Sequence, residues 1–306
     1  MTAPSPPPAS PAAAPSGRTG VLDSALLRRG QERFTGTLLI EGGQNGTVTM
    51  RDGLVVAAGT PAAPGPESLL LRSGRISEAD WTAAFDAAAP RGRLPAELVE
   101  RGLLGDAGLQ VLTQVAVVDA AFAMALCGVR TCTARPDTGP GGGTPGPVLP
   151  AEPGLDTGRL VREIARRLGA AVHWRDLGVE IHTRPHPAAE PGAPSADAPV
   201  EQGGPRGAVL AKVNGRRTAR DIAFTLGRGL YPVMADLATL AEDGLIRYGT
   251  PRAAASLTLA GHLVPEPEEA PPPEAEPTPG GLPRRLRGTS GIHLVLPWNG
   301  DEAARP

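Results

Sequence analysis

The sequence predicts an α+β protein with an N-terminal small β-sheet with packed helices and a C-terminal winged helix-turn-helix, joined by disordered Pro/Gly-rich linkers. Short apolar runs separated by Asn-Gly and Asp-Gly dipeptides predict the sheet. A helix–turn–helix–turn–helix pattern in residues 210–246 predicts the winged helix. Glycine and proline, 40 and 35 of the 306 residues, approach the level at which unstructured segments are expected, which predicts the linkers.

Four segments have the composition of linkers or tails and divide the chain. Each contains too few apolar residues to offset the entropy lost on ordering. They are a Pro/Ala/Ser tail over 1–16, Gly/Pro-rich linkers over 136–153 and 185–206, and an acidic Pro-rich linker over 263–283. The rest is predicted to form an α+β domain over 17–135, an amphipathic helix and short strand over 154–184, a winged helix-like domain over 207–262, and a docking segment over 284–306.

The N-terminal domain is predicted to begin with a short helix, "VLDSALLRRGQERF", followed by three strands. "TLLIE" and "TVTMR" flank Asn45-Gly46, and "LVVAAG" follows Asp52-Gly53. Both dipeptides favour positive φ, which a two-residue hairpin turn requires. A later run, "VRTCTA", is predicted to return to the sheet as an edge strand.

Helices are predicted between the third strand and that edge strand. Gly74 is expected to cap the first helix at its C-terminus, and Ser77 to cap the second at its N-terminus, with Asp80 three residues later. The longest helix, "DAGLQVLTQVAVVDAAFAMALCG", is mostly apolar but contains Asp119. We interpret Asp119 as a partly exposed edge position; the alternative is a functional carboxylate.

Residues 154–184 contain a basic amphipathic helix. Its apolar face holds Leu160, Val161, Ile164, Leu168 and Val172, and the arginines on or near the other face are Arg159, Arg162, Arg166 and Arg167. Such a helix can lie on a membrane surface, or it can pack against a neighbouring domain and keep its arginines in water. We favour the second interpretation.

The N-terminal domain also resembles a known bacterial family. Its pattern of an "F-x-G-x-L" strand, a second strand ending in "x-x-G-x-I/V-x-x-A", and a helical "LLLRSGRIS" run is carried by Phe34, Gly36, Leu38, Gly53, Val55 and Ala58. This pattern is similar to the domain of unknown function at the N-terminus of PatA-like response regulators, over residues 22–126. "VNGRRTARDIA" and "LATLAEDGLI" resemble the winged-helix module of MarR-like regulators. The resemblance implies a regulatory, non-enzymatic role in signalling or protein contact.

The residues of 210–246 also fit a winged helix physically. Thr218 is expected to cap the second helix, with Asp221 as its capping-box partner. The third helix is expected to begin near Pro232. "LIRYGTPRAAASLTLAG" is then predicted to form two short strands around Pro251, which would be the wing.

The third helix has few groups with which to read DNA bases. Its exposed face is predicted to hold Ala235, Asp236, Ala238, Thr239, Glu242 and Asp243. Base edges and phosphates require hydrogen-bond donors and positive charge, but this face offers carboxylates. Phosphate contacts would then depend on the surrounding arginines Arg216, Arg217, Arg220, Arg228, Arg247 and Arg252.

These observations favour a non-enzymatic bacterial regulatory protein that acts through contacts with a protein partner in signalling or transcription control. The alternative is a DNA-binding transcriptional regulator whose winged helix makes backbone-dominated contacts. The net charge of −2 argues against a dedicated nucleic-acid coat or a polybasic membrane binder. The sequence leaves the oligomeric state open.

No cofactor, metal or catalytic group is predicted. Cys127 and Cys132 are interpreted as two small buried thiols, because a zinc ion would need two further ligands nearby. His182 and His186 would share one face only in a helix, which the prolines on either side of His186 forbid.

The C-terminal segment contains an apolar run after an arginine-rich stretch. Ile292, Leu294, Leu296 and Trp298 are candidates for a short docking motif, or else complete the core of their own domain. The N-terminus lacks the apolar core of a signal peptide. No window approaches the ~18 to 20 apolar residues of a membrane span, because polar residues interrupt the richest one. We therefore expect a cytoplasmic protein without a membrane span.

Overall fold

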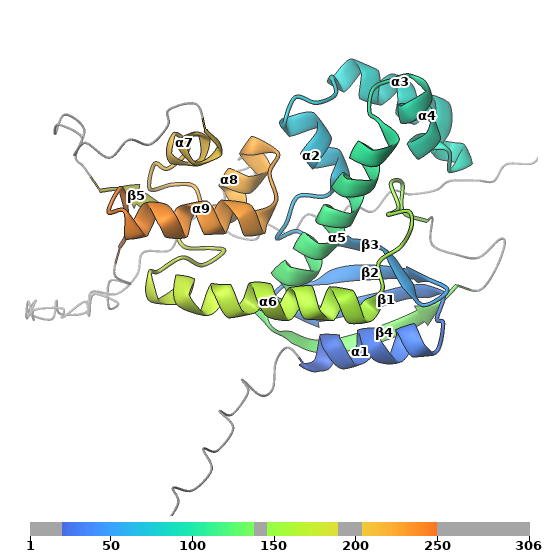
Figure 1. Cartoon of the computed structure of the whole chain (residues 1–306), viewed down its shortest axis with the longest axis horizontal. Coiled ribbons are helices and arrows are strands. Elements are labelled where there is room, and N and C mark those ends of the chain that lie inside the picture. The colour runs from blue at the N-terminus through green and yellow to red at the C-terminus, as the bar shows by residue number, and fades with distance from the viewer. Residues whose placement is uncertain (1–19, 138–145, 189–203, 250–306) are drawn as a thin grey trace, which may run out of the picture. The chain divides into compact units, whose positions relative to one another are not determined.

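The structure, a computed structural model, describes residues 20–137, 146–188 and 204–249. All of them belong to one compact unit, Met1–Ala255. Within them the protein is mixed α+β, as the sequence predicts (Figure 1). The candidate docking residues Ile292, Leu294, Leu296 and Trp298, and the candidate phosphate contact Arg252, lie outside the described residues.

A four-stranded antiparallel sheet forms the N-terminal part of the structure. Its strands, in spatial order, are β3 (Leu54–Gly59), β2 (Gly46–Arg51), β1 (Gly36–Gly42) and β4 (Val129–Pro136). The three predicted strands and the predicted edge strand are all present, and the edge strand pairs with β1.

The two turns of this sheet differ in conformation. Asp52 and Gly53 have φ angles of 49° and 81°, as a two-residue hairpin requires. Asn45 and Gly46 do not take positive φ, so that part of the prediction is wrong. There the Asn45 side chain accepts a hydrogen bond from the Gly42 N–H at 3.3 Å, and this side chain stabilises a longer connection.

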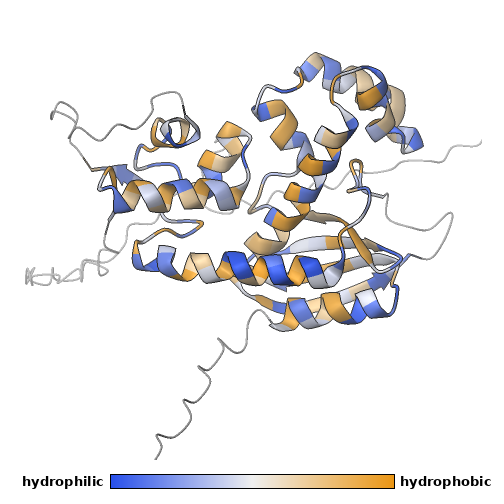
Figure 2. Ribbon diagram, viewed as in Figure 1, coloured by the Kyte–Doolittle hydropathy of each residue, from blue (hydrophilic) through white to orange (hydrophobic). Residues whose placement is uncertain are grey.

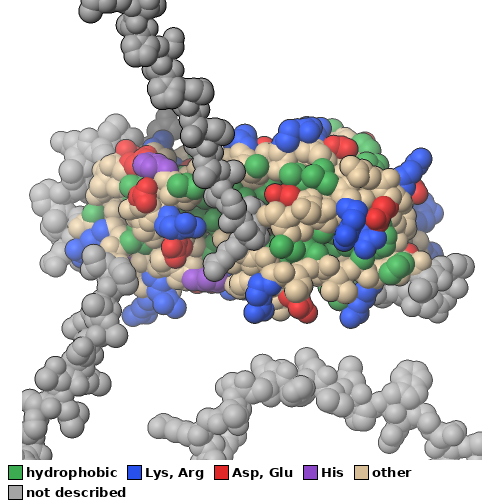
Figure 3. Space-filling view, turned by 90° about the horizontal axis from the view of Figure 1, so that it is seen from below, with side chains coloured by type: hydrophobic (Ala, Val, Ile, Leu, Met, Phe, Trp, Pro, Cys, Tyr) green, Lys and Arg blue, Asp and Glu red, His purple; other side chains and the backbone are tan. Residues whose placement is uncertain are grey.

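Three helices cover one face of the sheet (Figure 1). They are α1 (Gly20–Gln31), α5 (Asp106–Cys127) and α6 (Thr157–Asp176). The core between them and the sheet includes Leu22, Leu26, Leu38, Ile40, Val48, Val117, Ala121, Leu160 and Ile164. The basic amphipathic helix, α6, therefore packs on its neighbours, with hydrophobic and hydrophilic bands alternating along it (Figure 2). Val172, placed on its apolar face by the sequence, is 60% exposed instead. On the face of the molecule seen from below, basic and acidic side chains are intermixed (Figure 3).

A second cluster of helices follows β3. It comprises α2 (Pro66–Arg72), α3 (Glu78–Ala88), the short 3-10 helix η1 (Ala89–Arg91) and α4 (Leu94–Glu100). The caps are as predicted: Gly74 has a φ of 72° after α2, and the Ser77 hydroxyl accepts a hydrogen bond from the Asp80 N–H at 3.1 Å.

Residues 146–155 pack along β3, although the sequence predicts a linker over 136–153. Pro136 is the last residue of β4. Leu149 is buried in the core formed by α2, α3, α4 and α5, and Ala151 is buried against the sheet. The Ala151 N–H donates to the Val56 carbonyl at 2.7 Å. The predicted linker is therefore wrong for this part of the chain. Its overall composition is that of a linker, but burial of Leu149 and Ala151 anchors it to the protein.

The C-terminal part consists of α7 (Pro205–Leu210), α8 (Ala219–Leu226), α9 (Leu230–Glu242) and two strands, β5 (Pro185–Pro187) and β6 (Ile246–Tyr248). Thr218 and Asp221 form the predicted capping box at α8. β6 pairs with β5, which lies in a segment predicted to be a linker. The second strand of the predicted wing lies outside the described residues.

Helix α9 is enclosed rather than exposed. It packs against α5, α6, α7 and α8, and no residue from Leu230 to Ala241 is exposed. Ala238, predicted to face solvent, is 3% exposed, and Asp236 is ion-paired with Arg228 at 2.8 Å. The predicted outer face is therefore wrong for most of the helix; Glu242 and Asp243 at its C-terminal end are exposed.

Helix α5 is long and apolar enough to cross a membrane by length and composition, the one such helix among the described residues. However, 67% of its apolar window is buried inside the protein. It packs against the sheet, α2, α6 and α9, which is the environment of a core helix.

Candidate binding groove and the helix junction beside it

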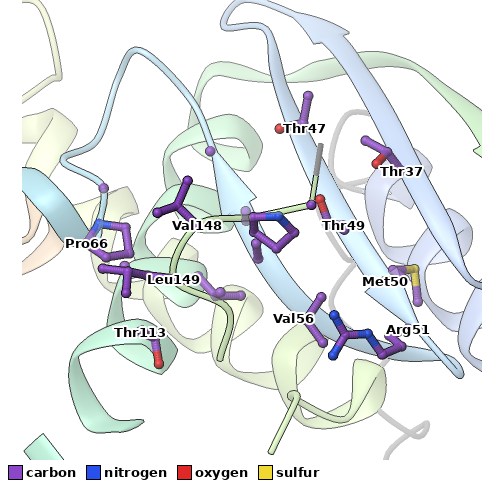
Figure 4. A pocket seen from close by; sticks show the side chains of 18 of the residues that line it. Thr37, Thr47, Thr49, Met50, Arg51, Val56, Pro66, Thr113, Val148 and Leu149 are labelled. Atoms are coloured by element: carbon purple, nitrogen blue, oxygen red, sulfur yellow. The ribbon is translucent and has the colours of Figure 1, made fainter. Parts of the chain in front are cut away.

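The open face of the sheet forms the floor of a groove of about 750 Å³ (Figure 4). This volume is within the range of roughly 300–1,000 Å³ that ligand sites occupy. Side chains alternate between the two faces of a strand. Leu38, Ile40 and Val48 point toward the helices. Their neighbours on β1 and β2 therefore point the other way, into the groove; these are Thr37, Leu39, Thr47 and Thr49.

The strand register arranges the floor in two rows. The first row crosses all four strands as Arg135, Thr37, Thr49 and Ala57. The second row crosses β1, β2 and β3 as Leu39, Thr47 and Gly59. The floor is thus rich in hydroxyls over β1 and β2, and its side chains are smallest over β3, at Ala57 and Gly59.

Apolar side chains form the wall on the β3 side. It consists of Val148 and Leu149, from the segment 146–155 (the crossing segment), and Pro66 at the start of α2. Thr113 of α5 lies beside them (Figure 4). The Thr113 hydroxyl donates within its own helix, to the Leu109 carbonyl at 3.0 Å, and the residue is 1% exposed, so it contributes little surface to the groove.

The charged groups of the groove are unevenly distributed. Arg135 is exposed on the floor and forms no ion pair with any described residue. Arg51 pairs with Glu152 at 3.6 Å. Glu67 follows Pro66 on the wall side, and Asp137 follows the end of β4.

A buried junction of three helices forms at Asp119 of α5, two residues after Val117, which lines the groove. Asp119 of α5 is 1% exposed and accepts hydrogen bonds from the Leu230 N–H and, at 2.9 Å, the Tyr231 N–H at the start of α9. It also pairs with Arg167 of α6 at 3.3 Å. The Arg167 guanidinium lies 4.5 Å from the centre of the Tyr231 ring, within cation–π range.

The environment of Asp119 differs from the prediction of a partly exposed edge position. Burial raises the pKa of this carboxyl, while the two backbone N–H groups and Arg167 act in the opposite direction. Arg167 is likewise not free in water, since its side chain is only 12% exposed. Glu163 bonds both Arg166 and Arg167 at 2.8 Å, and these guanidiniums lower the pKa of its carboxyl to about 2.

Two of the six arginines predicted to contact DNA have structural partners. Arg220 donates to the Pro61 carbonyl at 2.7 Å and lies over the Phe224 ring. Arg228 pairs with Asp236 and donates to the Pro205 carbonyl at 2.9 Å.

The remaining described arginines of that set lie nearer to water. Arg216 and Arg247 are exposed, and Arg217 is half-buried, with a long contact of 3.5 Å to the Lys212 carbonyl. Gly215 donates to the Pro185 carbonyl of β5, and Arg247 is opposite His186 in the β5–β6 pair. Arg184, which was not among the predicted contacts, donates to the Arg216 carbonyl at 3.0 Å. Arg184, Arg216 and Arg247 therefore all lie near β5.

Both cysteines are half-buried and free. Burial raises the pKa of the Cys127 thiol to about 11 and raises that of Cys132. Cys127 lines a second cavity of about 190 Å³ together with His182. His182 contacts the Gln44 amide at 3.0 Å. No group of three or more metal-binding side chains occurs in the described part of the chain.

Comparison with protein-family models, with curated proteins and with solved structures finds no match to this chain. The resemblance to PatA-like and MarR-like regulators therefore stays a prediction from the sequence.

Proposed function

We propose that this protein is a non-enzymatic regulatory protein that acts through protein–protein contacts in signalling or transcription control. The observation that carries the proposal is the groove on the open face of the N-terminal sheet. Its floor of two residue rows is about as wide as one extended chain, because alternate residues of a strand lie about 7 Å apart. An extended segment of a partner fits such a surface, with side chains against the apolar wall.

A second feature that supports a regulatory role is the position of α5. Thr113, Ala116 and Val117 of this helix line the groove. Asp119, half a turn further along, binds the first residues of α9. A partner that shifts α5 would therefore change the environment of α9, which is the physical requirement for coupling two sites.

Photo-crosslinking tests the proposed contact surface. A photoreactive amino acid at Thr47, exposed in the groove, should capture a specific partner in the native cell. The same group at Thr225, an exposed threonine of α8 outside the groove, should not. The purified partner should then bind the full chain and lose affinity for Thr47→Trp, which fills the groove, but not for Thr225→Trp. Equal capture at both positions, or unchanged binding to Thr47→Trp, would contradict the proposal.

DNA binding is the second candidate, and the arginines around β5 favour it. Arg184, Arg216 and Arg247 are exposed and offer three guanidiniums for phosphate contacts near β5. Helix α9 is enclosed by other helices and cannot enter the major groove of DNA in this conformation. Binding would therefore depend on contacts to the DNA phosphates and would be steeply salt-dependent. A gel shift at about 50 mM salt that is lost in Arg216→Ala/Arg247→Ala would support this candidate. The absence of a shift would reject it.

A further inference from the structure

We infer that the groove binds an extended peptide whose acidic side chain pairs with Arg135 and whose apolar side chain lies against Val148 and Leu149. This inference rests on the proposed function of the groove and adds the chemistry of its occupant.

The Arg135 end of the groove is built to receive a carboxylate. Arg135 is exposed, forms no ion pair with another described residue, and stands in register with Thr37 and Thr49 on the same face of the sheet. A guanidinium with adjacent hydroxyls offers several donors to a carboxylate, and hydrogen bonds of this charged kind are about twice as strong as neutral ones. Asp137 also lines the groove at this end, so recognition of an acid depends on Arg135 itself and not on net charge.

The opposite end of the groove favours an apolar side chain. The floor there is Ala57 and Gly59, and the wall is Val148, Leu149 and Pro66 (Figure 4). Glu67 lies beside Pro66 and would repel a second acidic residue at this end. The groove therefore distinguishes the two ends of its occupant.

The dimensions of the sheet set the spacing between the two side chains. Arg135 and Ala57 are separated by three strand intervals, or about 14 Å. An extended peptide crosses this distance in about four residues, at roughly 3.3 Å each. The preferred peptide therefore has an Asp or Glu about four positions from a Leu, Ile, Val or Phe.

Selection from a displayed library of random peptides tests this inference on the full chain. The wild-type protein should enrich peptides with the acidic and apolar residues at that spacing. Arg135→Glu should instead enrich Lys or Arg at the acidic position. Arg130→Glu is the matched control, because Arg130 is also exposed on β4 but does not line the groove, and it should select the same peptides as the wild type.

Binding of one synthetic selected peptide then gives the magnitude. We expect its affinity to fall about threefold in Arg135→Gln and about tenfold in Arg135→Glu, since an exposed ion pair is weak and charge reversal adds repulsion. Thr47→Trp should abolish binding.

The possible failures are distinguishable. If the selected peptides require an open groove but bind Arg135→Glu as well as the wild type, this inference is overturned while the proposed function stands. If no peptide is enriched, or if Thr47→Trp binds the selected peptides normally, both are overturned. Thermal unfolding of each variant verifies that an exposed substitution has left the fold intact.

Discussion

The Asp119 carboxylate joins α5, α6 and α9 at one buried point. Its partners, Leu230 and Tyr231, are 111 and 112 residues away in the chain, so no local pattern could identify them. The available signal was a single carboxylate inside an otherwise apolar helix. A buried carboxylate must find charge or hydrogen-bond partners, so the sequence required a partner for Asp119 without specifying which.

Replacing Asp119 with alanine should strongly destabilise the protein. Arg167 would keep Glu163 as a partner but lose the more deeply buried carboxylate, and two backbone N–H groups of α9 would lose their acceptor. Each unsatisfied donor costs about 1–3 kcal/mol, so we expect a total loss of about 3–5 kcal/mol, which urea unfolding measures directly. The exposed Asp86→Ala of α3 is the control and should change stability by less than about 0.5 kcal/mol. A loss below about 1 kcal/mol for Asp119→Ala would mean that the junction is not formed in solution.

At the scale of elements, the structure agrees with the sequence where the signal is local. The cap at Ser77, the Asp52-Gly53 turn and the capping box of Thr218 and Asp221 all follow from residues within a few positions of one another. The differences occur where distant elements decide the structure. β6 pairs with residues 185–187, and α9 is enclosed by four other helices, neither of which periodicity can predict.

The crossing segment 146–155 gives a test at this scale. Leu149 is buried among α2, α3, α4 and α5, whereas its neighbour Val148 is 45% exposed. Leu149→Ala should lower the free energy of unfolding by about 2–3 kcal/mol through a cavity in that core. Val148→Ala should change it by less than about 0.5 kcal/mol. Equal and negligible effects would mean that the segment behaves as a free linker, and would also remove one wall of the groove.

At the scale of the whole molecule, α5 is the element that unites the parts. It contributes to the core under the sheet, to the core of α2–α4 and, through Phe122 and Ala123, to the core around α9. The sequence predicts an N-terminal domain and a separate winged helix-like domain. That division does not predict that α5 of the first would contribute to the core around α9 of the second. The candidate groove was likewise not predicted, because its rows come from strand register and its wall from a segment interpreted as a linker.

Hydrogen exchange across the full chain tests this account most directly. If α5 joins the groove and α9 in one cooperative unit, backbone amides of α9 should be protected to the same degree as those of α5, and Asp119→Ala should lower the protection of α9 first. The opposite result is protection of α5 with rapid exchange throughout α9 in the wild-type protein. That pattern would show an independently folding C-terminal module and would contradict the coupling on which the proposed regulation depends.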